Sequence, residues 1–179
     1  MQRISVVGNS GSGKTTLARD VAVALAIPHL ELDSVFHQSG WRPLDAGSFR
    51  QRVTDFTAEQ AWIVDGNYSK VQDIVWARAD TVLWLDPPRN RVMRQVIWRT
   101  LRRAATRAEL WNGNREPWGN VIRLNPEESV IAWAWTRHRV YQDRYLAARA
   151  DPANSHLTFV RLRTAAEAVA LVQRMTKEE

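Results

Sequence analysis

The sequence predicts an α/β fold of three layers, in which helices cover both faces of a five-stranded parallel sheet. Two observations support this. Short runs of β-branched and apolar residues recur along the chain, at residues 3–7, 29–33, 61–64, 81–85 and 157–162. Segments between them carry apolar residues at helical spacing, and strands that alternate with helices are typical of a parallel sheet.

The length of the chain, 179 residues, fits one domain with a sizeable core. We expect a core over about residues 1–88 and 156–179, with a lid and its flanking helices over about 89–150. The chain lacks cysteine, which excludes disulfides, thiolate metal sites and a cysteine nucleophile. No apolar run approaches the length of a membrane span, so we expect a cytoplasmic monomer or homodimer with no membrane partner.

The formal net charge is +6, and only three of the 25 basic residues are lysine. Residues 89–149 hold thirteen arginines and five acids, a net charge of +8 that leaves −2 for the rest of the chain. Arginine forms bidentate contacts with phosphate groups. The basic region therefore indicates a phosphate site, a nucleic-acid surface or a solvated face, and composition alone does not separate the three.

A phosphate-binding motif follows the first predicted strand. Residues 8–15, GNSGSGKT, fit the P-loop pattern G-x-x-x-x-G-K-[ST], in which backbone N–H groups surround phosphate oxygens. The expected helix follows, with Leu17 and Val21 on one face. We expect Lys14 to contact the β- and γ-phosphates and Thr15 to bind Mg²⁺. The predicted ATP site comprises Gly8, Asn9, Ser10, Gly11, Ser12, Gly13, Lys14, Thr15 and Thr16.

Three predicted strands end in an acid: Asp33, Asp65 and Asp86. Ligands of open α/β sheets bind beyond the carboxyl ends of the strands. A carboxylate beside the P-loop strand suits the Mg²⁺ shell, and both Asp65 and Asp86 qualify. Asp33 is a candidate to orient or deprotonate an acceptor hydroxyl. His37 follows in an aromatic stretch, and a surface histidine is the more common case.

Arginines border the predicted lid on both sides. In a helix over residues 90–103, Arg99 and Arg103 lie at the edge of an apolar half formed by Val92, Met93, Val96, Ile97, Thr100 and Leu101, whereas Arg91 and Arg102 point away. Residues 104–124, rich in tryptophan and turn residues, are predicted to form a lid that excludes water.

A second helix is predicted to begin at Asn125. Arg137 and Arg144 lie at the edge of its apolar face. Trp133 and Trp135 of the same helix are expected in the core. The sequence thus nominates four arginines as phosphate ligands, one pair on each side of the lid.

The order of elements, the P-loop, Leu32-Asp33, the run WIVDGNY at 62–68 and the arginines around the lid resemble the adenylate kinase-like P-loop kinases. The resemblance covers nearly the whole chain. It is closest to a bacterial subgroup known as adenylate kinase-related or DNA topology modulation proteins. It implies a P-loop NTPase fold with an arginine-rich helical lid and gives the four nominated arginines counterparts before and after that lid.

The family's third strand ends in Asp-Gly-Phe-Pro-Arg, and Asp65-Gly66 match its first two positions. The resemblance therefore favours Asp65 for the Mg²⁺ shell. It also places Arg163 near the loop that contacts adenine. Residues 67–69, Asn-Tyr-Ser, replace Phe-Pro-Arg, so the arginine that grips the monophosphate of AMP has no counterpart and AMP is not the expected acceptor.

The predicted function is that of a kinase resembling the nucleoside monophosphate kinases, which transfers the γ-phosphoryl group of ATP to a small-molecule acceptor. Charge neutralisation by Lys14, Mg²⁺ and the lid arginines would supply most of the rate. The nominated acceptor residues are Asp33, Arg42, Asn67, Tyr68 and Arg115. Two alternatives stay open: a nucleotide-regulated protein that binds nucleic acid through its arginine-rich region, and an ATPase without a small-molecule acceptor.

Overall fold

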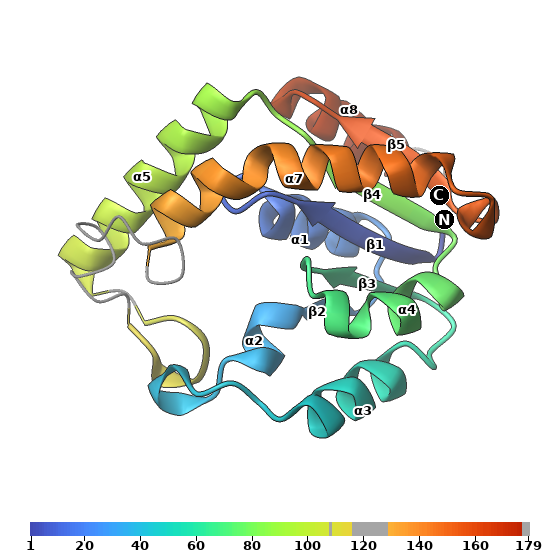
Figure 1. Ribbon diagram of the computed structural model, residues 1–179. Coiled ribbons are helices and arrows are strands. Elements are labelled where there is room, and N and C mark those ends of the chain that lie inside the picture. Colours follow the sequence, from blue (N-terminus) through green and yellow to red (C-terminus); the bar gives the residue numbers. More distant parts are fainter. Residues whose placement is uncertain (108, 116–128, 177–179) are drawn as a thin grey trace.

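The computed structural model describes residues 1–107, 109–115 and 129–176 (Figure 1). Five strands form one sheet in the order β2-β3-β1-β4-β5, and all neighbouring pairs are parallel. The strands are β1 (Arg3–Gly8), β2 (His29–Glu31), β3 (Trp62–Asp65), β4 (Thr81–Leu85) and β5 (Thr158–Leu162). The predicted parallel sheet is confirmed, and β1 lies at its centre.

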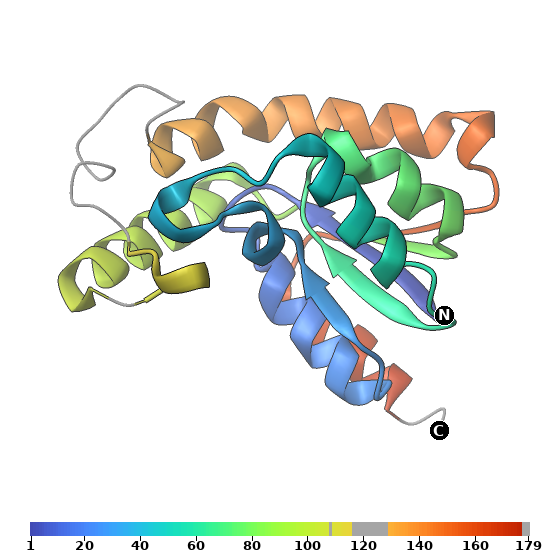
Figure 2. The same ribbon diagram turned by 90° about the horizontal axis from the view of Figure 1, so that it is seen from below.

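Helices cover both faces of the sheet, which gives the predicted three layers (Figures 1 and 2). One face carries α1 (Lys14–Ala24) and α8 (Ala165–Met175). The other carries α4 (Ser69–Arg78) and α7 (Val130–Ala150), with α3 (Ala46–Phe56) beside them. Shorter elements and the long helix that precedes the predicted lid complete the described chain: α2 (Leu32–Phe36), η1 (Ser39–Trp41), α5 (Arg89–Thr106), η2 (Trp111–Gly113) and η3 (Pro152–Asn154).

The central strands are buried on both faces, so their side chains alternate between two cores. In β1, Ile4 and Val6 pack with α1 and α8, whereas Val7 packs in the cluster under α4 and α7. In β4, Leu83 joins the first cluster and Trp84 the second. This double burial explains why the strands appear in the sequence as continuous apolar runs.

α5 differs from its predicted pattern of burial. Val92 and Val96 are buried against Ala134 of α7, but Ile97 and Leu101 are each 39% exposed. The prediction of a continuous buried half is therefore wrong. The reason is geometric: α5 extends away from the sheet and packs along α7, so a single helix covers only a narrow stripe of it (Figure 1).

Other local predictions need correction. Trp135 is 53% exposed, so its assignment to the core is wrong, and the Arg89 guanidinium lies 3.5 Å from its ring centre. The predicted strand over residues 29–33 is too long, because β2 ends at Glu31 and Asp33 lies in α2. α4 occurs where the sequence analysis names no element. Ser129 is the N-cap of α7 and accepts from the N–H of Ala132. The predicted helix start at Asn125 and residues 108 and 116–124 of the predicted lid lie outside the described residues.

Among the helices described, none combines the length and the apolar composition required to cross a membrane.

Candidate nucleotide and acceptor site

The predicted P-loop connects the central strand to α1 at the carboxyl edge of the sheet. Gly13, the N-cap of α1, has φ 97° and ψ 13°, and no side chain caps the helix. The N–H groups of the first helical turn therefore remain available to an anion. The Ser12 hydroxyl is buried and has no hydrogen-bond partner among the described residues. A buried hydroxyl of this kind calls for a hydrogen-bond partner, and a phosphate oxygen bound in the loop would supply one.

Two carboxylates approach the hydroxyl that follows the P-loop lysine. Thr15 Oγ1 lies 3.3 Å from Glu31 Oε1 and 3.5 Å from Asp65 Oδ1. The register of the sheet explains this, because Glu31 at the end of β2 pairs with Asp65 at the end of β3. His29 Nε2 lies 3.0 Å from the other oxygen of Asp65. The cluster of Thr15, Glu31 and Asp65 offers oxygen ligands of the kind that Mg²⁺ prefers.

The sequence analysis does not nominate Glu31. The alternation of His29-Leu30-Glu31 carries the signal, because it places His29 and Glu31 on the same face of β2, but only the pairing with β3 brings them to Asp65. The described residues contain no group of three or more His, Cys, Asp or Glu side chains that could hold a metal by itself. Phosphate oxygens and water would complete the shell, as is usual for Mg²⁺.

Asp86, the alternative metal ligand, is already paired. Arg161 of β5 donates to Asp86 from two nitrogens, with its Nε 2.9 Å from Oδ2. Gln142 of α7 donates to the same carboxylate at 2.9 Å. Asp86 is 5% exposed, so these contacts satisfy a buried charge. The geometry favours Asp65 over Asp86 for the metal.

Of the nominated arginines, Arg99 has a described contact with the P-loop. Its NH2 donates to Ser10 Oγ at 3.0 Å, which connects α5 to the loop. Arg103 lies one turn further along α5 and is half-buried. Arg137 is exposed with its guanidinium 4.5 Å from the ring centre of Trp133, and Arg144 donates to Gln72 of α4.

A cavity of ≈ 350 Å³ opens beside the P-loop between α1 and α8. Its polar lining includes Ser12, Gly13 and Thr16 of the loop region together with Arg91 and Arg163; its apolar lining includes Leu17, Leu85, Leu162, Ala168 and Val172. Its size lies in the range of small-molecule sites. Arg163 thus lies where a group attached to the bound phosphates would fit. Arg91 is exposed, as expected, but it also lines this cavity.

Only some of the nominated acceptor residues lie close to one another. Tyr68 donates its hydroxyl to Asp33 Oδ1 at 2.6 Å, and His37 Nε2 lies 3.3 Å from the same hydroxyl. Burial and the nearby Asp33 carboxylate raise the pKa of Tyr68, so the phenol remains a donor. Arg42 is exposed, and its Nε donates to Ser39 O at 3.3 Å. Asn67 is turned towards the P-loop, where it contacts Gly8.

Residues 111–115 of the predicted lid lie against the aromatic stretch after β2 (Figure 1). Asn114 Oδ1 accepts from the N–H of Trp41 at 2.8 Å, and Asn114 Nδ2 donates to Gln38 O at 2.9 Å. The carbonyl of Arg115 accepts from Trp41 Nε1 at 3.2 Å, and the Arg115 side chain is exposed. The two segments that the sequence analysis treats separately therefore form one wall near Asp33 and Tyr68.

No family model matches the chain. Over 59 residues, 30% of this chain, it is 41% identical to the cytidylate kinases of two strains of Nitratidesulfovibrio vulgaris. The aligned region is 25% of each kinase, so the chain matches about a quarter of the length of these curated relatives.

Two solved shikimate kinases share the fold. One, from Acinetobacter baumannii in complex with shikimate, has a TM-score of 0.55 at 17% identity, over 99% of this chain and 92% of that one. The other, from Bacteroides thetaiotaomicron, has a TM-score of 0.52 at 13% identity, over 99% and 97%. These likenesses confirm the P-loop α/β fold, and they do not single out the adenylate kinase-related subgroup.

Proposed function

We propose that the protein is an ATP-dependent phosphotransferase that acts on a small-molecule acceptor. The observation that carries the proposal is the arrangement on both sides of the P-loop. The ≈ 350 Å³ cavity lies towards the β5 edge of the sheet. Towards the opposite edge, Asp33, which follows β2, pairs with Tyr68, which follows β3. The loop thus separates a space for a nucleoside from a carboxylate that can receive a hydroxyl proton. The partial identity to cytidylate kinases supports the same class of reaction.

The donor half would hold ATP with its base in the cavity beside Arg163 and its phosphates on the P-loop. Lys14 and Arg99 would offset the negative charge on the transferred group. Thr15, Asp65 and Glu31 would hold Mg²⁺, which when bound neutralises charge on the β- and γ-phosphates. The Ser12 hydroxyl, buried and unpartnered among the described residues, would gain an acceptor from a phosphate oxygen.

The acceptor half would use Asp33 on a hydroxyl. The acceptor oxygen forms a bond to the γ-phosphorus, the bond to the bridging β–γ oxygen breaks, and ADP leaves. The hydroxyl proton passes to Asp33 and then to solvent. Tyr68, which donates to one Asp33 oxygen, would leave the other free to accept that proton. Arg42, Arg115 and the remaining lid arginines, Arg103, Arg137 and Arg144, stay proposals as ligands of acceptor or phosphate.

The test is a screen of hydroxyl and phosphate acceptors for stimulated ATP consumption, against a control without acceptor. We expect at least one acceptor to stimulate turnover, and Lys14→Ala to lower that turnover by about a hundredfold or more, because it removes a charge from the transferred phosphoryl group. Turnover that no acceptor stimulates would favour an ATPase. A Lys14→Ala variant with wild-type turnover would contradict the P-loop assignment.

One observation favours a second candidate, binding of single-stranded nucleic acid. Arg94, Trp98 and Arg102 lie one turn apart on the outer face of α5, and Trp98 is 70% exposed. An aromatic ring between arginines is suited to base stacking with phosphate contacts. Binding to a single-stranded oligonucleotide should then weaken steeply with salt and fall in Trp98→Ala. If the chain does not bind the oligonucleotide even at low salt, this candidate is excluded.

A further inference from the structure

Asn67 occupies an unusual position beside the first glycine of the P-loop. Its Oδ1 accepts from the N–H of Gly8 at 3.1 Å, and its Nδ2 donates to the carbonyl of the same residue. Backbone pairing between β1 and β3 ends at Val6 and Asp65. Beyond this point the Asn67 side chain forms hydrogen bonds with both the N–H and the carbonyl of Gly8, as the backbone of a neighbouring strand would.

Gly8 needs such support because it adopts a backbone conformation that other residue types rarely adopt. Its φ is 149°, and a Cβ at this position would lie 2.5 Å from the carbonyl oxygen of Leu85. Glycine gives the chain this conformation at a high entropic cost. Asn67 fixes the peptide groups on both sides of the Gly8 Cα. Because a peptide group is planar, holding the Gly8 carbonyl also sets the direction of the Asn9 N–H, where the phosphate loop begins.

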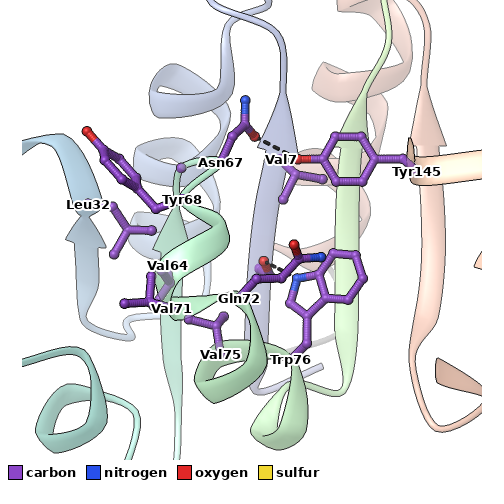
Figure 3. Close-up of a pocket in the computed structure, with 12 residues that line it drawn as sticks. Val7, Leu32, Val64, Asn67, Tyr68, Val71, Gln72, Val75, Trp76 and Tyr145 are labelled. Carbon is purple, nitrogen blue, oxygen red and sulfur yellow. Dashed lines mark hydrogen bonds between the residues drawn. The ribbon is translucent and has the colours of Figure 1, made fainter. Parts of the chain in front are cut away.

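Tyr145 of α7 fixes the orientation of the Asn67 carboxamide (Figure 3). Its hydroxyl donates to Asn67 Oδ1 at 2.9 Å. Tyr145 is 1% exposed, and its ring lies 5.7 Å from that of Trp84 and 6.3 Å from that of Trp76. Oδ1 receives two donors and Nδ2 faces a carbonyl. A flipped carboxamide would place its NH₂ against the Gly8 N–H and its oxygen against the Gly8 carbonyl. Burial raises the pKa of Tyr145, which keeps the hydroxyl protonated.

The space beside Asn67 argues against a role as an acceptor ligand on this side. The cavity that Asn67 lines together with Tyr145 and Trp76 measures ≈ 20 Å³, which is room for about one water molecule (Figure 3). The P-loop has a second hydrogen bond to α7, besides the one between Asn67 and Tyr145: Asn9 Nδ2 donates to the carbonyl of Ala134 at 2.7 Å. The start of the P-loop is thus fastened to α7 at two points, and one of them passes through Asn67.

We propose that Asn67 is a positioning residue of the phosphate site, which holds the Gly8 peptide groups in their binding conformation and is itself oriented by Tyr145. This rests on the proposed function, since it requires that the loop binds nucleotide phosphates. It reassigns Asn67 from the acceptor half of the site to the donor half. It also gives α7 a direct connection to the conformation of the P-loop.

The experiment measures by calorimetry how tightly the wild type, Asn67→Ala, Tyr145→Phe and the double variant bind ATP in the presence of Mg²⁺. Circular dichroism first establishes that each variant is folded. Asn67→Ala should weaken binding by about tenfold, since the loop must be ordered at the expense of binding energy. Tyr145→Phe, which keeps the ring, should weaken it by about threefold. The double variant should bind no more weakly than Asn67→Ala, because both act through one carboxamide.

Asn154→Ala is the matched control. Asn154 Nδ2 also donates to a backbone carbonyl, that of Ala148 at 2.9 Å, but it lies at η3 beyond the end of α7. It should lower the unfolding temperature and leave ATP affinity unchanged. If Asn67→Ala and Tyr145→Phe behave like this control, the proposal is overturned while the proposed function stands. If the wild-type chain does not bind ATP at all, both are overturned. If Asn67→Ala does not fold, Tyr145→Phe decides the question. Unchanged ATP affinity in Tyr145→Phe would overturn the proposal. An ATP affinity about threefold lower in Tyr145→Phe, together with unchanged ATP affinity in Asn154→Ala, would support it.

Discussion

The two acids that follow β3 and β4 show how differently the same residue type behaves within one sheet. Asp65 lies at the end of β3 with Thr15, Glu31 and His29 around it. Asp86 follows β4 and is held by Arg161 and Gln142. The sequence presents both as an acid after an apolar strand. Their partners, which come from distant parts of the chain, give them different roles.

The substitutions Asp65→Asn and Asp86→Asn should therefore separate metal binding from stability. Asp65→Asn should abolish the Mg²⁺ dependence of ATP binding, since it removes a charged oxygen ligand beside Thr15. Asp86→Asn should leave that dependence in place and lower the free energy of unfolding by about 2 kcal/mol or more, because Arg161 loses its carboxylate. Calorimetry at several Mg²⁺ concentrations and denaturant unfolding measure the two effects. The reverse pattern would assign the metal to Asp86.

At the scale of elements, one carboxylate joins the start of β1 to the start of β4. Asp80 Oδ2 accepts from the N–H groups of Gln2 and Arg3, each at 2.9 Å, and Oδ1 accepts from the Thr81 hydroxyl at 2.7 Å. Burial opposes ionisation of Asp80, but these hydrogen bonds outweigh it and hold its pKa below the ordinary 3.8. The central strand is thus anchored at its amino end by a single side chain.

The stability that Asp80 provides should depend on pH. Because its pKa is lower in the folded state, the contribution is complete above the ordinary value of 3.8 and is lost as the pH falls through the folded pKa. Asp80→Asn should lower the free energy of unfolding by about 1 kcal/mol at neutral pH and by progressively less in acid. Denaturant unfolding from neutral to acid pH tests this, with Asp143→Asn on the exposed side of α7 as control. A constant difference between wild type and Asp80→Asn across this range would refute the linkage.

The order of the strands organises the whole molecule around the P-loop. β1 lies at the centre of the sheet, with the strand that leads to Asp33 at one edge and the strand that leads to Arg163 at the other. The ≈ 350 Å³ cavity is bounded by residues from α1 and α8, which lie on the same face of the sheet. The nucleoside part of a ligand would thus be recognised by the two ends of the chain together.

Filling this cavity should separate recognition of the nucleoside from recognition of the phosphates. Ala168→Trp places an indole in the cavity but leaves the P-loop backbone intact. The substitution should lower the affinity for ATP by about tenfold or more, because the nucleoside of ATP would occupy the volume that the indole fills. The affinity for tripolyphosphate, which has no nucleoside, should change by less than about twofold. Competition of each ligand in calorimetry checks this, with Ala22→Ser on α1 as a variant that does not line the cavity. Equal weakening of both ligands would mean that the substitution disturbs the P-loop itself.

The sequence predicts the sheet and the phosphate loop well, because both depend on local patterns. The apolar runs at 81–85 and 157–162 correspond to β4 and β5 within one residue at each end. Local pattern does not show which elements cover one another. Ile97 and Leu101 have helical spacing but are each 39% exposed, and Trp135 stacks with Arg89 on the surface.

The sequence predicts which residue types form the candidate site better than it predicts which of these residues contact one another. Lys14 and Thr15 follow from the motif. The end of an apolar strand nominates Asp65 and Asp86 equally, and the family resemblance favours Asp65. Glu31 and Asn67 meet their partners, Asp65 and Gly8 respectively, across the sheet. The alternation of residues 29–31 indicates which face Glu31 occupies, but the sequence alone does not show either pairing. The assignment of Asp33 with Tyr68 is consistent with their contact at 2.6 Å, although they are far apart in the sequence.

The two walls of the ≈ 350 Å³ cavity are synthesised at different times. The wall with Gly13 and Thr16 is synthesised well before the wall with Leu162 and Ala168. A nascent chain therefore carries the phosphate loop long before it can enclose a nucleoside. Ligand that binds only the folded state stabilises that state by mass action. Cellular ATP would consequently stabilise finished chains and give little help to those still on the ribosome.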